Sequence, residues 1–312
     1  NLFMKKSILI IGSGGFFGKS ILDYLKKKKN LKKRINKIIL ISRSKKNYIH
    51  PEIKNNYKVV QIKEDISKAK KIIFADYVIY CAISKDYIGD YKGVKNYFKL
   101  AKKYHKNSSI VYTSSGAVYG KQPKKNIKIN DFQKVDPKKY FSQLKKKYAL
   151  LKIKNEKIFQ NLSNENIKVC AARCFTFVGK YLPLDSNYVI GNFIKSILDN
   201  QPIEVKSKIK VTRTYMHADV LAECLIKLVF NNSTNFTTYN IGSDNIIDIH
   251  SLAKKLSKKY KIENINQKNI SKKDYDRYAP SISKFRKKFK FKKHLNSYNA
   301  IIKSIKEFKQ NK

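Results

Sequence analysis

The chain has 312 residues, of which 42% are hydrophobic, so it can fold around a substantial core and is not intrinsically disordered. Its net charge of +47 comes from lysines spread along the whole chain; arginine is scarce and no basic block alternates with aromatic residues, which argues against specific nucleic-acid binding. No apolar stretch approaches the ~20 residues of a membrane-spanning helix, and the N-terminus lacks the features of a secretory signal. We therefore expect a cytoplasmic globular protein whose charge attracts small anions.

Apolar runs and helix-like stretches alternate through the first half of the chain. The runs are short and rich in β-branched residues, as buried strands are, and they are predicted at 7–11, 37–41, 57–62, 77–82, 109–112 and 167–171. Helices are predicted from the first run as far as residue 25, at about 94–103 and at about 143–162. This alternation is typical of an α/β protein with a doubly wound parallel sheet.

The second half of the chain has longer loops and shorter elements, with turn signals at 181–184 and 200–202. We therefore predict a first domain over residues 1–173 and a smaller mixed α/β lobe over 174–312. Part of this lobe is expected to return to the first sheet, whose carboxyl edge is where ligands of doubly wound folds bind. The cysteines at 81, 170, 174 and 224 lack metal-ligand spacing, so free thiols and no metal site are expected.

A glycine cluster with the spacing G-x-x-G-x-x-G directly follows the first predicted strand and precedes the first helix. Its members are Gly12, Gly15 and Gly18, and Phe16 and Phe17 lie between the last two. Glycine permits a tight turn and a close approach of the backbone to a ligand, and a helix N-terminus favours a pyrophosphate. In this strand–turn–helix context the motif predicts a dinucleotide site in the first domain, with a purely structural turn as the alternative.

Residues that follow the later strands bear on the choice of cofactor. Where an NAD site places a carboxylate on the ribose, the chain has Ser42, Arg43 and Ser44, which suit the 2′-phosphate of NADP. We predict NADP, with NAD possible and a solvated loop arginine as the alternative interpretation. Asp65 and Ile66 follow the third strand, where adenine is often contacted, although a helix N-cap is an equally good interpretation. The other predicted cofactor contacts end later strands: Cys81, Ala82 and Thr113.

Tyr148 and Lys152 are one helical turn apart and therefore share a helix face. An ammonium beside a phenol favours the phenolate, so such a pair can transfer a proton near neutral pH. The same spacing occurs at 24/28 and 91/95, but only the pair at 148/152 opens a long helix after a strand that ends in two serines, Ser114 and Ser115. We predict a proton-transfer centre there that works with a hydride carrier.

These motifs occur together with further segments at 172–175, 191–193, 213–217, 239–242 and 277–280. On them the chain resembles, over nearly its full length, the extended short-chain dehydrogenases/reductases of the NAD-dependent epimerase/dehydratase family, which act on sugar nucleotides. The resemblance implies a Rossmann domain at 1–173 and a substrate-binding lobe at 174–312. It also implies a homodimer formed by the helices near 94–103 and 143–162, the second of which carries extra apolar residues.

The resemblance also implies roles for particular residues. Ser115 would be the catalytic hydroxyl, Tyr148 the acid/base and Lys152 the holder of the nicotinamide ribose. The substrate-binding residues that it implies are Ser114, Asn192, Arg213 and Arg277. Of these, Arg213 matches an arginine that grips the substrate diphosphate, whereas Arg277 has a surface charge as its alternative interpretation.

Two departures from the family pattern narrow the expected reaction. The 4,6-dehydratases carry carboxylic residues directly after the catalytic hydroxyl, where this chain has Gly116 and Ala117, so elimination and decarboxylation are disfavoured. The family's usual aspartate two positions after Ala218 is replaced by Val220, with Asp219 one residue early. We expect a 4-keto sugar-nucleotide reductase of deoxysugar or polysaccharide precursor synthesis. The alternatives are a 4-epimerase with tightly bound NAD and a non-enzymatic nucleotide-binding protein.

His217 and His250 are two further candidate bases. His217 has apolar neighbours along the chain, and a packed, hydrogen-bonded histidine is the more frequent case. We therefore expect a structural role for it.

Overall fold

The computed structural model describes residues 6–43, 49–84, 86–121, 142–185, 188–262, 265–267, 271–292 and 295–310. The chain divides into two compact units. The first consists of residues 1–118, 140–174 and 222–239, and the second of residues 119–139, 175–221 and 240–312. The predicted domain boundary at residue 173 remains a prediction. No helix within the described ranges is long and apolar enough to cross a bilayer.

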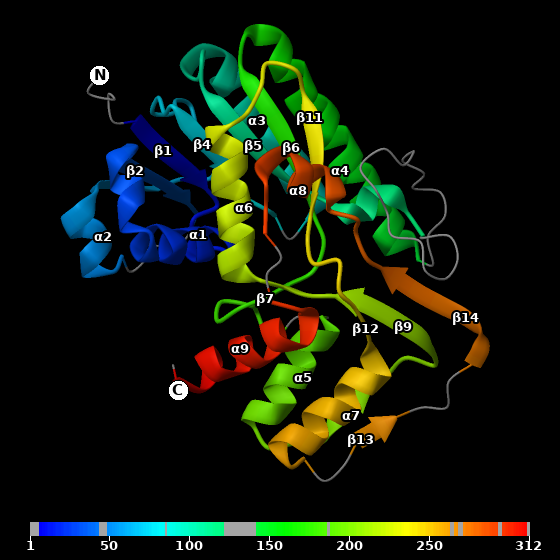
Figure 1. The fold of residues 1–312 in the computed structure, drawn as a ribbon. Helices are drawn as coiled ribbons and strands as arrows, with labels where there is room; N and C mark the ends of the chain where they lie inside the picture. Colours follow the sequence, from blue (N-terminus) through cyan, green and yellow to red (C-terminus); the bar gives the residue numbers. More distant parts are fainter. Residues whose placement is uncertain are drawn as a thin grey trace. The chain divides into compact units, whose positions relative to one another are not determined.

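A seven-stranded sheet with the order β11–β6–β5–β4–β1–β2–β3 organises the first unit (Figure 1). All the pairings from β3 to β6 are parallel. The strands are β1 (Lys6–Ile11), β2 (Ile35–Ser42), β3 (Lys58–Lys63), β4 (Tyr77–Tyr80), β5 (Ser109–Ser115), β6 (Lys168–Cys174) and β11 (Thr237–Ile241). The six strands predicted in the first half are confirmed, and the strand order reverses beside β1, which is where such sheets bind ligands.

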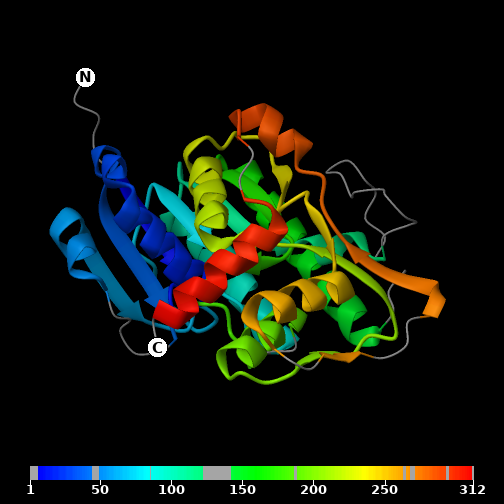
Figure 2. The same cartoon turned by 60° about the horizontal axis from the view of Figure 1, so that its bottom comes forward.

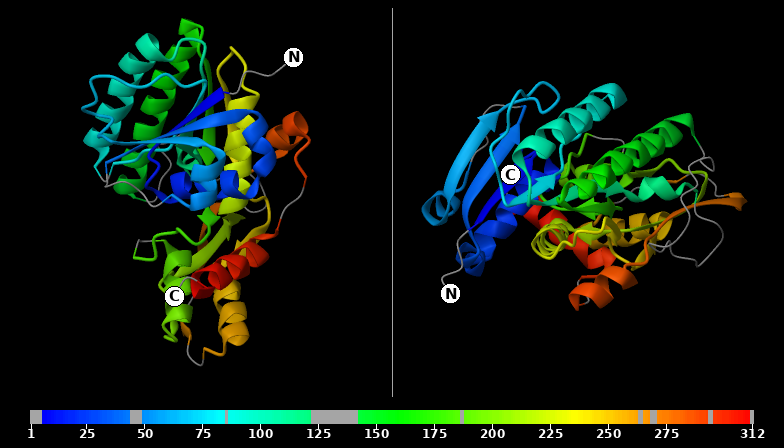
Figure 3. Two further views of the ribbon diagram at one scale, coloured as in Figure 1. Left: turned by 90° about the vertical axis from the view of Figure 1, so that its left-hand side faces the viewer. Right: turned by 90° about the horizontal axis from the view of Figure 1, so that it is seen from above.

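Helices cover both faces of this sheet, which is why its central strands β1, β4 and β5 are almost entirely buried. Figure 3 shows α3 (Tyr87–Tyr104) and α4 (Gln143–Leu162) on one face, and α1 (Phe16–Lys27) and α6 (Ala218–Phe230) on the other. The short α2 (Pro51–Asn56) precedes β3. The core under α3 and α4 contains central strand residues together with helix residues such as Val94, Tyr97 and Phe159. Among its rings, those of Tyr112 and Phe159 stack with centroids 4.3 Å apart.

The helix α3 begins seven residues before its predicted start. Asp86 caps it by accepting a hydrogen bond from the backbone N–H of Gly89. The helix then passes through Gly93, where an added Cβ would lie 3.2 Å from the hydroxyl of Tyr80 and 3.3 Å from Ile66. Glycine lowers helix propensity, but here it lets the helix pack closely on the sheet.

The described residues of the second unit form three small sheets, β12–β9–β14, β13–β8 and β10–β7. Their strands are β7 (Phe177–Val178), β8 (Ile203–Val205), β9 (Ile209–Thr214), β10 (Met216–His217), β12 (Ile246–Asp248), β13 (Ile265–Gln267) and β14 (Ser271–Tyr278). The helices are α5 (Val189–Leu198), α7 (Ile249–Tyr260), α8 (Ser283–Phe289) and α9 (Ser297–Gln310), of which α7 contacts β9 and α9 contacts α5 (Figure 2). Parallel and antiparallel pairs occur together, as expected for a mixed α/β lobe.

Candidate active site

The glycine loop links β1 to α1 at the point where the strand order reverses. Gly12 has φ +93°, and an added Cβ would lie only 2.5 Å from the backbone nitrogen of Ala82. A Cβ on Gly18 would lie 2.5 Å from the Cα of Ser13. Gly15 is the N-cap of α1, no side chain caps this helix, and its first turn contains no acidic residue. The loop therefore has the close backbone packing and the uncapped helix N-terminus that suit a pyrophosphate.

The ends of β4 and β5 lie beside this loop. The Cys81 N–H donates to the carbonyl of Ile11 at 2.9 Å, which joins the end of β4 to the end of β1. The hydroxyl of Thr113 on β5 donates to the carbonyl of Tyr80 at 3.2 Å. Phe16 and Phe17, the first residues of α1, are half-buried, with ring centroids 5.7 Å apart. The predicted cofactor residues at these positions thus share one edge of the sheet.

Arg43 lies in an exposed position after β2, and its guanidinium donates to the carbonyl of Ile83 at 3.1 Å. The carboxylate of Asp65 accepts from the N–H and the hydroxyl of Ser67 at 2.9 and 2.8 Å. Burial acts to raise the pKa of Asp65, but these hydrogen bonds and the charge of Arg43 lower it overall. Asp65 thus caps a turn and not a helix. Ser42 ends β2, Ile66 is buried, and Ser44 lies outside the described residues.

Tyr148 and Lys152 lie in the first half of α4, and the Lys152 ammonium is 5.7 Å from the centre of the Tyr148 ring. The pairs at 24/28 and 91/95 have similar spacings, 5.9 and 5.6 Å, so the spacing alone does not distinguish them. Burial of the lysine distinguishes the three pairs: Lys152 is 3% exposed, whereas the lysines at 28 and 95 are on the surface. Tyr148 itself is half-buried, so a buried ammonium lies near an accessible phenol.

Neighbouring oxygens stabilise the charge on Lys152. Burial alone would lower the pKa of this ammonium, but Tyr112, Tyr148 and Asp90 raise it above its usual value. Its Nζ lies 5.3 Å from the centre of the Tyr112 ring and 3.9 Å from Oδ2 of Asp90. Lys152 therefore stays protonated over the whole physiological pH range.

A buried polar network fixes α4 against the end of β5. The Ser114 hydroxyl donates to Oε1 of Glu156 at 2.5 Å. The guanidinium of Arg173 on β6 donates to both carboxylate oxygens of Glu156, at 3.0 and 2.8 Å. Because Ser115 follows Ser114, and Tyr148 lies two turns before Glu156, these bonds hold both the predicted hydroxyl and the predicted acid/base at the carboxyl edge of the sheet. Ser114, which is predicted to bind substrate, has its hydroxyl engaged in this network.

Ser115 ends β5, and its hydroxyl oxygen accepts the N–H of Ala117 at 3.1 Å. Gly116 and Ala117 begin a short 3₁₀ turn (Gly116–Tyr119). Neither has a side chain that can transfer a proton. The segment thus orients one hydroxyl and supplies no carboxylate.

In the second unit, the two predicted arginines differ in their partners. Arg213 on β9 pairs with Asp276 on β14, its Nη2 lying 2.8 Å from Oδ2. Arg277 is 8% exposed, and its Nε and Nη2 have no hydrogen-bond partner among the described residues. Burial lowers the pKa of Arg277 below its usual value. The register pairs Arg277 with Thr212, so the two arginines point to opposite faces of their sheet. The interpretation of Arg277 as a surface charge is therefore wrong.

Three further predictions concern Asn192, His250 and the cysteines. Asn192 is an exposed residue of α5. His250 is buried, and its Nε2 contacts the carbonyl of Ser207 at 3.3 Å. The four cysteines are free thiols, as predicted.

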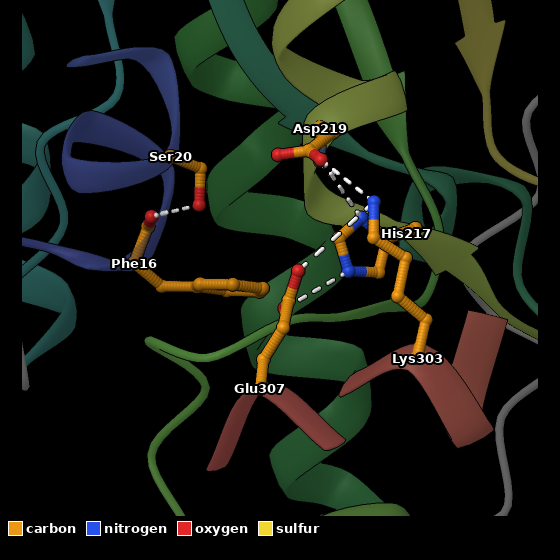
Figure 4. A network of polar contacts seen from close by, with 6 residues as sticks. All are labelled: Phe16, Ser20, His217, Asp219, Lys303 and Glu307. Carbon is orange, nitrogen blue, oxygen red and sulfur yellow. Dashed lines mark hydrogen bonds and ion pairs between the residues drawn. The ribbon is translucent and has the colours of Figure 1, made fainter. Parts of the chain in front are cut away.

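His217 belongs to a polar network in the second unit (Figure 4). It is 2% exposed; its Nε2 is 3.1 Å from Oε2 of Glu307, and its Nδ1 accepts the N–H of Asp219 at 3.2 Å. Lys303 approaches the carboxylate of Asp219 at 2.8 Å and that of Glu307 at 4.0 Å. The ammonium of Lys303 thus pairs with both carboxylates, and His217 is packed and hydrogen-bonded, as expected for a structural histidine.

Comparison with known proteins identifies the family. The model of the NAD dependent epimerase/dehydratase family matches residues 8–242. The chain belongs to this family. A search of curated proteins by sequence found no match. The predicted family and the predicted doubly wound fold are thereby confirmed.

Solved structures with low sequence identity share the fold over almost the whole chain. A UDP-N-acetylglucosamine 4-epimerase from Methanobrevibacter ruminantium in complex with UDP-N-acetylmuramic acid is 20% identical, with a TM-score of 0.79 and coverage of 99% of this chain and 100% of that one. A UDP-glucose 4-epimerase from Thermotoga maritima with UDP-glucose is 15% identical (TM-score 0.78; 98% and 99%). A dTDP-glucose 4,6-dehydratase from Streptomyces venezuelae, solved with NAD bound, is 14% identical (TM-score 0.76; 97% and 97%). The fold is that of sugar-nucleotide epimerases and dehydratases.

Proposed function

We propose that this protein is an NADP-dependent reductase of a nucleoside-diphosphate 4-keto sugar. The observation that carries the proposal is the buried, protonated Lys152 beside the accessible Tyr148, on a helix bonded to the strand that ends in Ser115. Gly116 and Ala117 supply no group for elimination, which favours reduction or epimerisation over dehydration.

Each residue of the proposed centre has a distinct task. A bound nicotinamide would supply or accept the hydride at the sugar carbon. Ser115 orients the carbonyl oxygen, and Tyr148 gives it a proton, so that the ketone becomes an alcohol. Lys152 stabilises the charge change at Tyr148 and holds the cofactor ribose. The loop from Gly12 to Gly18 would hold the pyrophosphate, since its backbone is closely packed and no side chain caps the N-terminus of α1.

The substrate diphosphate is assigned to Arg277. Two nitrogens of this buried guanidinium have no partner among the described residues, an unfavourable state that a bound phosphate would relieve by accepting hydrogen bonds. Arg213, which already pairs with Asp276, is the second candidate, and the exposed Asn192 could contact the nucleotide.

Cofactor use tests the reaction itself. Purified protein is incubated with NADPH and the 4-keto-6-deoxyhexoses of UDP and dTDP, and we expect one NADPH to be consumed for each sugar reduced. A 4-epimerase would instead interconvert UDP-glucose and UDP-galactose without net loss of cofactor. A protein that binds these nucleotides and performs neither reaction would be the non-enzymatic alternative.

The preference for NADP rests on Arg43. We expect NADPH to bind more tightly than NADH, and Arg43→Asp to reverse the preference, because a charge-assisted contact to phosphate is worth about 1.5–3 kcal/mol, more than tenfold in affinity. Fluorescence titration with both cofactors measures this. Equal affinities in the parent protein would contradict it, and would agree with a guanidinium that stays on the carbonyl of Ile83.

A homodimer through α3 and α4 remains a prediction. Leu144 and Leu150 are 66% and 39% exposed and Ile88 is 69% exposed, which provides apolar surface on this helix pair. Ala149 and Phe159 are buried in the protein's own core, and exposed lysines share the outer faces. We expect a dimer mass by light scattering at micromolar concentration, and weaker association at low salt because the lysines repel one another. A monomer mass at high salt would refute the predicted homodimer.

A further inference from the structure

A buried carboxylate faces Lys152 from the helix that packs beside α4. Asp90, in the first turn of α3, is 5% exposed, and its Oδ2 lies 3.9 Å from the Lys152 ammonium. The same oxygen accepts the side-chain amide of Asn155 at 3.0 Å, and Oδ1 accepts the N–H of Ser84 at 3.2 Å. Two hydrogen bonds, from Asn155 on α4 and from Ser84 before α3, therefore fix this carboxylate next to the Lys152 ammonium.

The carboxylate changes what the ammonium does to the phenol. A lone ammonium favours the phenolate, whereas an anion on its other side offsets part of this field. We propose that Asp90 is a positioning residue that holds Lys152 and offsets its charge, so that Tyr148 serves as an acid. This inference rests on the proposed function and deepens it, because a reductase needs a proton donor whereas an enzyme that starts by oxidising an alcohol needs a base.

The offset of the Lys152 charge is assigned to Asp90, because the other titratable groups that face this lysine do not supply it. The groups that face Lys152 or Asp90 from the packed elements are Tyr148 on α4, Tyr112 on β5, Cys174 on β6 and Tyr80 on β4. Burial raises the pKa of Tyr112 to about 12 and raises those of Cys174 and Tyr80 above their usual values. These three are therefore neutral at neutral pH. Of the two nearby carboxylates, Glu156 is bound by Arg173, whereas Asp90 lies 3.9 Å from the Lys152 ammonium.

Tyrosinate absorbance tests the proposal without substrate. The chain has 21 tyrosines, so each enzyme is titrated with and without the Tyr148→Phe change, and the difference isolates Tyr148. We expect the midpoint of this signal to move down by about one pH unit in Asp90→Asn, because the ammonium then acts unopposed. The alkaline limb of kcat for reduction should move down by the same amount. Asp90→Ser, a smaller neutral change, gives the same readout if the asparagine variant does not fold.

Two controls separate charge from packing. Asp90→Glu keeps the carboxylate and should leave the midpoint unchanged. Asn155→Ala removes a hydrogen bond to the same carboxylate but keeps its charge, so it should lower stability without moving the midpoint. An unchanged midpoint in Asp90→Asn, or an equal shift in Asn155→Ala, would overturn the proposal. Absence of any reductase activity in the parent protein would overturn the proposed function alone, since the titration uses no substrate.

Discussion

Replacing Tyr148 by Phe should lower turnover at least 100-fold while leaving cofactor affinity nearly unchanged. The change removes one oxygen and keeps the aromatic packing, and a positioned proton donor typically contributes ~10²–10⁴-fold. Steady-state kinetics with an identified keto-sugar substrate measures the loss, and fluorescence titration measures cofactor binding.

The neighbours of Tyr148 provide matched comparisons. Lys152→Ala should lose both turnover and cofactor affinity, because the ammonium is also expected to hold the ribose. Ser115→Ala should lose turnover alone. Tyr24→Phe and Tyr91→Phe change the tyrosines of the two other Tyr/Lys pairs, whose lysines are on the surface, and should have no such effect. A Tyr148→Phe enzyme that kept more than about half its activity would show the mechanism to be wrong.

Replacing Arg277 by Gln should have opposite effects on binding and on stability. Loss of a charge-assisted contact should weaken the binding of UDP by about 1.5–3 kcal/mol, ~10–100-fold. The free protein should become more stable, because a buried guanidinium with two unpartnered nitrogens is removed. Calorimetric titration with UDP and thermal unfolding of the same samples give the two values.

Arg213→Gln is the control on the adjacent strand. It leaves Asp276 without the partner that now lies 2.8 Å away, so it should lower the melting temperature and weaken UDP less than Arg277→Gln does. If Arg213→Gln weakened UDP more than Arg277→Gln, the diphosphate would have to be assigned to Arg213, as the family resemblance first suggested.

The sequence by itself determined the sheet and the approximate positions of the proposed cofactor and proton-transfer residues. Strands that are buried on both faces have continuous runs of apolar residues. The strands β1, β2 and β4 could therefore be predicted from the residues between 7 and 82. The strand–glycine–helix context of Gly12 and the helical spacing of Tyr148 and Lys152 are local properties of the chain. They could therefore be inferred from neighbours in the sequence alone.

Only the tertiary structure decided what surrounds each of these residues. Gly89 and Gly93 lower the helix propensity at the start of α3, so the sequence placed that start after Asp90 and missed its contact with Lys152. The sequence predicted that part of the second lobe returns to the first sheet but did not identify the segment; in the structure β11, more than sixty residues after β6, lies at the edge of that sheet. The sequence also ranked Arg213 above Arg277, whereas in the structure Arg277 is buried and two of its nitrogens have no partner among the described residues. Burial and charge pairing depend on residues that are far apart in the chain. Local sequence patterns do not show which of these residues come into contact.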